Sequence, residues 1–205
     1  ADKRVGGIVK KWQTILVSQI KNVIQYPNQV IFNAKIPLDG RDTPIRSVQT
    51  NLGQVITKAM SFAYKNQVDC ALVNGGSIRI DDQLSGLVTA VDIFRVLPYG
   101  GGVLKVGIKG SLLGRVLEYG IKSQGEGAYL QRFNASKLDG IWMIKGRALD
   151  NNKTYTVAFS DYLLKGLDIP FLSSSNSEIT YIFQPKDTAL ASDIRKAVIN
   201  YLKSL

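Results

Sequence analysis

The chain has 205 residues, of which 45% are hydrophobic and 20% are charged, a composition typical of an ordinary soluble globular protein. It contains no histidine, which excludes catalytic zinc sites, Ser-His and Cys-His nucleophile pairs and most imidazole general bases. The formal net charge of +10 predicts attraction to anions, although the basic residues are scattered, so a generally basic surface is the alternative.

Few of the remaining side chains suggest chemistry. The nearest candidate for an oxygen-ligand metal site is the adjacent pair Asp81–Asp82, which is more typical of a solvated turn. The single cysteine, Cys70, lies in an apolar run, which indicates an inert buried thiol. No apolar run reaches the roughly 18 residues that a membrane span needs. Because residues 1–5 lack both an initiator Met and the apolar core of a signal peptide, we expect a removed leader or a longer parent chain.

The first predicted element is an amphipathic helix over residues 5–24. A half-buried strand over 30–36 follows, with an apolar face of Val30, Phe32, Ala34 and Ile36. Residues 37–44 form a loop by composition, and Thr50 or Asn51 caps a helix that runs to about residue 64. The later predicted elements are a buried strand at 70–73, a polar turn between Ile80 and Thr89, a short helix at 89–96, a strand at 103–108, a helix at 111–121, a β meander at 133–159, one helical turn at 161–166, a strand at 179–183 and a C-terminal helix carrying Leu190, Ile194, Val198 and Leu202.

Two glycine loops are the most informative stretches. The buried strand at 70–73 runs into Asn74, two glycines and Arg79, and a second loop offers Tyr99 before three more glycines. Glycine lets the backbone turn sharply or approach a ligand, a guanidinium binds anions, and an aromatic ring stacks. These are the parts of a nucleotide-sized pocket, although Gly-Gly after a strand is often only a turn. Arg46 precedes a helix and could meet an anion near its N-terminus, or lie exposed in a loop.

Taken together, these segments resemble the C-terminal, substrate-recognition domain of the 5′-nucleotidase family, which includes UDP-sugar hydrolases and cyclic-nucleotide phosphodiesterases. The matching segments, in order, are L-D-G-R-D-x-x-I-R-S-V-Q-T-N-L-G (38–53), A-L-V-N-G-G-S-I-R (71–79), L-P-Y-G (97–100), K-G-x-x-L-x-x-x-L-E (109–118), G-A-Y-L-Q (127–131) and K-T-Y-T-V (153–157). The resemblance covers essentially the whole chain. It implies a single α+β domain over 29–205, with mixed sheets covered by helices in an α/β/β/α layering, preceded by an interdomain connector helix over 1–28.

The resemblance also implies roles for particular residues. The positions that match the family's substrate-binding residues are Arg46, Asn74, Gly76, Arg79, Tyr99, Gly127, Tyr162 and Asp168. In the family, two aromatic rings clamp the nucleobase, and here these would be Tyr99 and Tyr162. Arg46 and Arg79 match the arginines that bind phosphate and substrate, and Asp168 matches the carboxylate that holds the ribose hydroxyls. Asn74 and Gly127 match groups that contact the substrate near the base.

One loop departs from the family pattern. The family's usual G-G-D-G-[YF] reads Gly166-Leu167-Asp168-Ile169-Pro170-Phe171 here, so the backbone need not take the positive φ angles that glycines allow. This departure makes the placement of Asp168 and Tyr162 an open question at the level of the sequence. Tyr162 could instead be an ordinary packed aromatic side chain.

The resemblance predicts a nucleotide-recognition domain of a hydrolase that acts on phosphate ester bonds. The parent's N-terminal metallophosphoesterase domain would hold two divalent metal ions, whereas this chain would need no cofactor and would be inactive alone. The expected ligand is a nucleotide or nucleoside, and the expected location is periplasmic or extracellular. The alternatives are a standalone nucleoside-binding module and, less favoured, a basic nucleic-acid binder.

Overall fold

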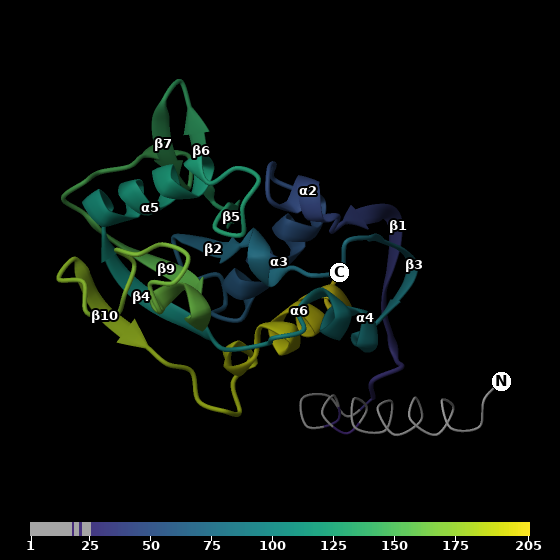
Figure 1. The fold of residues 1–205 in the computed structure, drawn as a ribbon. Coiled ribbons are helices and arrows are strands. Elements are labelled where there is room, and N and C mark those ends of the chain that lie inside the picture. The colour runs from purple at the N-terminus through teal and green to yellow at the C-terminus, as the bar shows by residue number, and fades with distance from the viewer. Residues whose placement is uncertain (1–17, 19–20, 22–25) are drawn as a thin grey trace.

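The computed structural model describes Ser18, Lys21 and residues 26–205. The predicted helix at 5–24, and with it most of the predicted connector, lies outside the described residues. Within them the predicted α+β class is confirmed: mixed sheets are covered by helices (Figure 1). No helix in this described part is both long enough and apolar enough to cross a membrane.

A five-stranded sheet divides the molecule into two cores. Its strands, in spatial order, are β10 (Ile179–Phe183), β4 (Val103–Lys109), β9 (Thr154–Ser160), β2 (Cys70–Asn74) and β5 (Leu130–Phe133). β2 and β9 run parallel, and the other neighbouring pairs are antiparallel. Successive side chains of a strand point to opposite faces, so Ala71 and Val73 enter one core cluster while Cys70 and Leu72 enter the other. Burial raises the pKa of the Cys70 thiol, as expected for an inert one.

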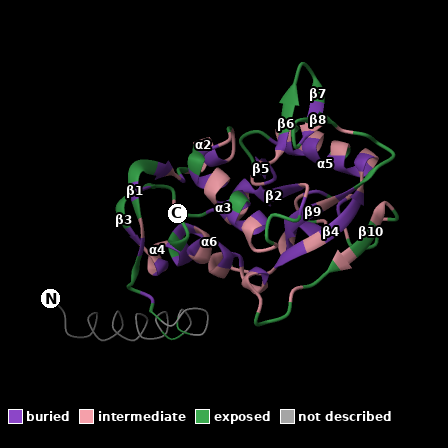
Figure 2. Cartoon of the chain, turned by 180° about the vertical axis from the view of Figure 1, so that it is seen from behind, coloured by how far each residue is buried: buried purple, intermediate pink, exposed green. Residues whose placement is uncertain are grey.

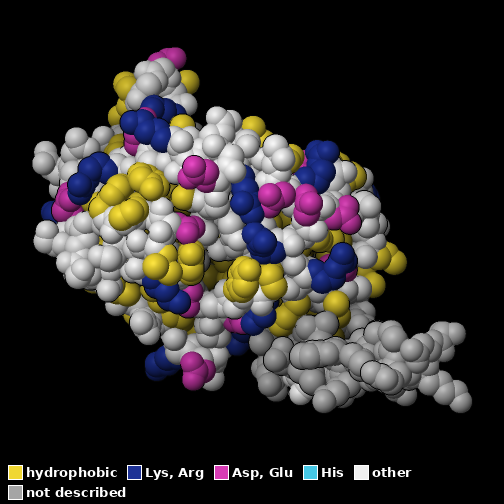
Figure 3. Space-filling view, in the orientation of Figure 1, with side chains coloured by type: hydrophobic (Ala, Val, Ile, Leu, Met, Phe, Trp, Pro, Cys, Tyr) yellow, Lys and Arg dark blue, Asp and Glu magenta, His cyan; other side chains and the backbone are white. Residues whose placement is uncertain are grey.

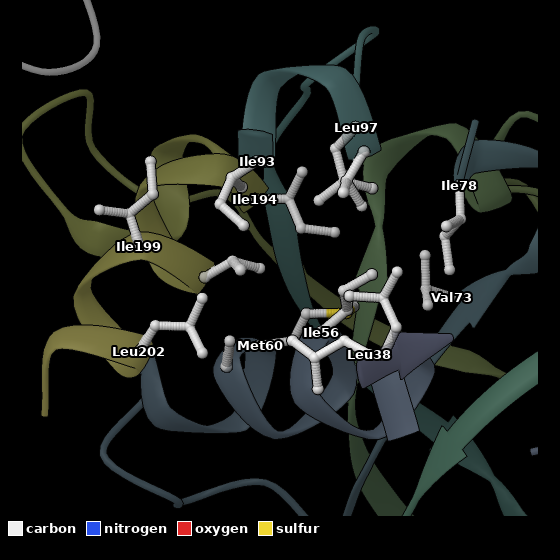
Figure 4. Packing of buried hydrophobic residues seen from close by; sticks show 14 of the residues in the cluster. Leu38, Ile56, Met60, Val73, Ile78, Ile93, Leu97, Ile194, Ile199 and Leu202 are labelled. Carbon is white, nitrogen blue, oxygen red and sulfur yellow. The ribbon is translucent and has the colours of Figure 1, made fainter. Parts of the chain in front are cut away.

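Helices cover both faces of this sheet. The first core contains apolar side chains of α3 (Asn51–Phe62), α4 (Ala90–Val96) and α6 (Ile194–Lys203), which point toward one another in Figure 4. The second core contains those of α5 (Gly110–Lys122). The predicted caps are present: the Thr50 side chain accepts from the Gly53 amide, and Thr89 forms a capping box with Asp92.

The N-terminal ribbon differs from the prediction. β1 (Val30–Asp39) extends into the predicted loop at 37–44, which also contains a short helix, α2 (Asp42–Ile45), and β1 pairs with β3 (Gln83–Thr89), where we predicted a polar turn. The predicted apolar face is confirmed only in part: Ala34 is 3% exposed and Phe32 packs against the first core, whereas Val30 and Ile36 are 47% and 75% exposed. Two register shifts in the β1–β3 pairing break the alternation on which that face was based. Much of this ribbon is coloured exposed in Figure 2.

The predicted meander at 133–159 is wrong in its pairing. β6 (Ala135–Leu138), β7 (Ile141–Ile144) and β8 (Arg147–Ala148) form a separate three-stranded sheet that projects beside α5, whereas β9 joins the central sheet. The turns at Asp139-Gly140 and Lys145-Gly146 are confirmed by positive φ angles at all four residues. The C-terminal helix begins at Ile194, later than predicted, after a 3₁₀ turn at Leu190–Ser192.

A buried glutamine fixes the segment between α2 and α3 against the central sheet. Gln131 on β5 is 0% exposed; its Oε1 accepts from the Thr50 amide at 3.0 Å, and its Nε2 donates to the carbonyls of Ile45 and Val48 at 2.8 and 2.6 Å. Gly53 leaves room for this amide, because a Cβ there would lie 2.0 Å from Gln131 Oε1. Gln131 therefore determines where residues 45–50 lie.

Replacing Gln131 with leucine should destabilise the fold by about 3 kcal/mol. The apolar side chain has a similar size but leaves the buried Thr50 amide and the buried Ile45 carbonyl without this partner, and each such group costs about 1–3 kcal/mol. The measurement is the free energy of unfolding from urea denaturation.

Gln124→Leu is the matched control for this prediction. In the wild type, Gln124 Nε2 donates to the Ser47 carbonyl of the same segment from an exposed position. Losing this hydrogen bond should therefore lower the free energy of unfolding by less than about 0.5 kcal/mol. Equal losses for the two variants would contradict the role given to Gln131.

Candidate functional site

A cavity of about 520 Å³ opens at one end of the central sheet, and every residue predicted to bind substrate lines it. The surface in Figure 3 is hollowed near its centre, where hydrophobic, basic and acidic side chains meet. The full lining consists of Arg46, Val73, Asn74, Gly76, Ser77, Arg79, Leu97, Tyr99, Gly100, Gly101, Gly127, Ser160, Asp161, Tyr162, Lys165, Asp168 and Ile194. The structure thus brings the predicted residues together, while their part in binding stays a prediction.

Strand direction explains why these residues share one edge. β2 and β9 are parallel neighbours, so Asn74 at the end of β2 and Ser160 at the end of β9 lie at the same edge of the sheet. β4 is antiparallel to β9 and begins opposite Ser160, which brings the preceding glycine loop to that edge. β5 is antiparallel to β2 and begins opposite Asn74, which brings Gly127 there as well.

The two loops that carry the tyrosines are bonded to each other. The Gly102 carbonyl accepts from the Asp161 amide at 2.9 Å, and the Gly102 amide donates to Asp161 Oδ2 at 3.0 Å. Gly101 has φ +95°, and a Cβ there would lie 2.6 Å from Asp161 Oδ1, so only glycine fits this contact without strain. Asp161 therefore sets the position of the Tyr99 loop relative to Tyr162, the next residue in the chain.

The tyrosines differ in their surroundings. Tyr99 is 75% exposed, whereas Tyr162 is half-buried and donates its hydroxyl to Asp168 Oδ1 at 3.0 Å. Burial, and next the hydrogen bond to Asp168, raise the pKa of the Tyr162 phenol above its ordinary value. The Lys165 ammonium lies 5.9 Å from the centre of the Tyr162 ring.

The two predicted arginines lie in different settings. Arg46 follows α2 and pairs through Nη2 with Asp42 Oδ1 at 2.8 Å, while its Nε is buried with no hydrogen-bond partner in the described chain. Arg79 is exposed and has no ion pair within the described residues. Both guanidiniums can therefore offer N–H groups to an anion in the cavity.

The altered loop at 166–171 still brings Asp168 into the cavity. Leu167 and Ile169 do not take positive φ angles, and only Gly166 does, with φ +70°. Ile169 is fully buried in the second core, while Leu167 is 67% exposed. The packing of Ile169 in the second core fixes the position of this loop without the family's glycines. Asp168 Oδ2 accepts a hydrogen bond from Asn74 Nδ2 at 2.7 Å.

The remaining glycines provide a close backbone contact. The Gly76 amide donates to the Gly127 carbonyl at 2.9 Å, and a Cβ on Gly76 would lie 3.1 Å from the Gly127 Cα. The Gly127 carbonyl is thus already engaged, and its second lone pair and its amide remain for a ligand.

Sequence reasoning missed four polar side chains of the cavity. Ser77, Ser160, Asp161 and Lys165 line it, although none was predicted. Ser77 belongs to the A-L-V-N-G-G-S-I-R segment, and the other three lie within three residues of Tyr162, so adjacency to matched positions was the available signal. Among the described residues, no group of three or more Cys, Asp or Glu side chains is placed to hold a metal ion.

Comparison with protein-family models matches residues 30–173 to the family described as "5′-nucleotidase, C-terminal domain", which covers more than half of the chain. The chain is 29% identical over 142 residues to human 5′-nucleotidase, which corresponds to 63% of this chain and 24% of that protein. It is 32% identical over 137 residues to the protein UshA of Yersinia enterocolitica, covering 64% of this chain and 24% of UshA.

Solved structures show the same fold. The 5′-nucleotidase precursor of Thermus thermophilus matches with a TM-score of 0.72 and 23% identity over 94% of this chain and 40% of that one. The NAD nucleotidase of Haemophilus influenzae matches with a TM-score of 0.67 and 17% identity over 100% of this chain and 39% of that one. The chain thus spans well under half the length of these relatives. By fold and by sequence, it belongs to the 5′-nucleotidase C-terminal domain family.

Proposed function

We propose that this chain binds a nucleotide or nucleoside in the cavity, with the base between Tyr99 and Tyr162, the sugar at Asp168 and the phosphate at Arg46 and Arg79. The observation that supports this most is that one cavity gathers two rings, two guanidiniums and a carboxylate. Its volume of about 520 Å³ falls within the range of about 300–1,000 Å³ typical of small-molecule sites.

Each group has the chemistry that its part of the ligand requires. Stacking on an aromatic ring contributes about 1–3 kcal/mol per base and tolerates different bases. Guanidinium N–H groups match phosphate oxygens in geometry and charge, and the buried Arg46 Nε lacks a partner among the described residues. The carboxylate of Asp168 accepts hydrogen bonds, as the hydroxyls of a ribose require.

We further propose that the chain is the recognition part of a longer hydrolase that acts on nucleotide phosphate esters in the periplasm or outside the cell. Its length relative to 5′-nucleotidases and UshA supports this, since it covers 24% of each of the two relatives compared above. A separate N-terminal metallophosphoesterase domain with two divalent metal ions would supply the hydrolytic chemistry. The residues described here would bind and orient the substrate, which lowers the barrier through positioning.

Tyr99→Ala should weaken adenosine binding by about tenfold or more, because the variant loses the stacking energy of one ring. The measurement is titration calorimetry on the purified chain. Tyr26→Ala is the control, since Tyr26 is also exposed, at 62%, but does not line the cavity. Equal affinities of the wild type and Tyr99→Ala would contradict the base clamp.

Arg79→Ala should weaken AMP binding by about tenfold while changing adenosine binding little, because only AMP carries the phosphate that a charge-assisted hydrogen bond would hold. Arg95→Ala, which removes an exposed arginine outside the cavity that pairs with Asp92, serves as the comparison. Parallel losses for AMP and adenosine would show that Arg79 does not contact the phosphate.

The purified chain should release no phosphate from AMP when Mg²⁺ or Mn²⁺ is added. Its sequence has no histidine, and the described residues offer no acidic or thiol cluster that could hold a metal. A malachite-green assay over several hours measures this. Turnover that scales with chain concentration, and that persists after further purification, would refute the proposal that a separate N-terminal domain supplies the hydrolytic chemistry.

A further inference from the structure

Four side chains form a continuous hydrogen-bonded network along the cavity wall. Ser77 Oγ donates to Asn74 Oδ1 at 2.6 Å, Asn74 Nδ2 donates to Asp168 Oδ2 at 2.7 Å, and the Tyr162 hydroxyl donates to Asp168 Oδ1 at 3.0 Å. All four residues line the cavity. The network joins one tyrosine of the proposed base clamp to the carboxylate proposed to hold the sugar.

The donors and acceptors of this network have a fixed order. Because the Asp168 carboxylate can only accept, the Asn74 amide nitrogen must face it, which leaves Asn74 Oδ1 to accept from Ser77; Asn74 is only 2% exposed. Each oxygen of the Asp168 carboxylate thus accepts one hydrogen bond from the protein. Two donors on different oxygens fix the plane of the carboxylate, and each oxygen keeps a lone pair for a ligand hydroxyl.

Tyr162 contributes two separable groups. Its ring lines the cavity, and its hydroxyl is one of the two donors that hold Asp168. A phenylalanine would keep the ring but leave the carboxylate held only by Asn74, free to rotate about its Cβ–Cγ bond. A phenol at its ordinary pKa of about 10 already keeps its proton at neutral pH. Burial and the hydrogen bond to Asp168 raise the pKa of Tyr162 further, so its hydroxyl is a donor here.

We infer that the Tyr162 hydroxyl is a positioning group that orients Asp168 toward the hydroxyls of a ribose, so that this cavity discriminates ribonucleosides from 2′-deoxyribonucleosides. The inference rests on the proposed function, and it adds the sugar as the part of the ligand that the site distinguishes. A carboxylate that is already oriented loses less conformational entropy when it accepts hydrogen bonds from two vicinal hydroxyls. A 2′-deoxyribose offers only one of these two hydroxyls, so it gains less from the oriented carboxylate.

The test compares Tyr162→Phe with the wild type for three probes: adenosine, 2′-deoxyadenosine and free adenine. In the wild type we expect adenosine to bind at least fivefold more tightly than 2′-deoxyadenosine. In Tyr162→Phe the ratio of adenosine affinity to 2′-deoxyadenosine affinity should fall at least threefold. The affinity for adenine, which reports ring stacking and an intact fold, should stay within twofold.

Two further variants separate positioning from other effects. Tyr181→Phe removes a hydroxyl that lies 2.9 Å from the Thr156 hydroxyl, outside the cavity, and should leave the ratio unchanged. In an Asp168→Asn background, adding Tyr162→Phe should change the ratio no further, because the hydroxyl acts through the carboxylate.

The outcomes distinguish this inference from the proposed function. If the wild type binds none of the three probes, the proposed function fails and the inference fails with it. If the wild type binds them but Tyr162→Phe leaves the ratio unchanged or raises it, the inference alone is overturned. A rise would mean that the hydroxyl competes with the sugar for Asp168 rather than orienting it.

Discussion

The buried amide of Gln131 is the contact on which the geometry of the site depends. It satisfies three backbone groups of residues 45–50, and its bonds to the Thr50 amide and the Ile45 carbonyl are buried. This fixes both the N-terminus of α3 and the backbone of Arg46. Gly53 makes the contact sterically allowed. The phosphate side of the proposed site is therefore shaped by a residue that does not line the cavity itself.

The opposite side of the cavity depends on strand order. The parallel pair β2 and β9, each with an antiparallel neighbour, brings two strand ends and two strand beginnings to one edge. Four loops far apart in the sequence thereby contribute side chains to a common space. Asp161 then connects two of these loops directly through Gly102. Because the sheet is buried on both faces, this arrangement is rigid at its base, and the ligand-facing side chains are carried on short loops.

Two features near Asp168 hold its carboxylate in the cavity. Where the family has glycines near Asp168, Ile169 is buried in the second core and anchors the loop by packing. Tyr162 adds a hydroxyl that reaches that same aspartate. Tyr162 and Ile169 lie seven residues apart and both act on this one carboxylate, so a hydrogen bond and apolar packing together hold the functional group of the loop.

The sequence by itself determined the α+β class, most helices and strands, the Thr50 and Thr89 caps and eight of the residues that line the cavity. These follow from local periodicity, capping chemistry and motif matching, which depend on near neighbours in the chain. It did not determine the β1–β3 ribbon, the departure of β9 from the predicted meander, or the contacts of Asp161 and Tyr162. Strand pairing and register shifts are decided by partners distant in sequence, and a hydroxyl's partner is decided by which loop the fold places opposite it. Only the tertiary structure therefore showed that the ring of one predicted residue and the carboxylate of another are joined by a hydrogen bond.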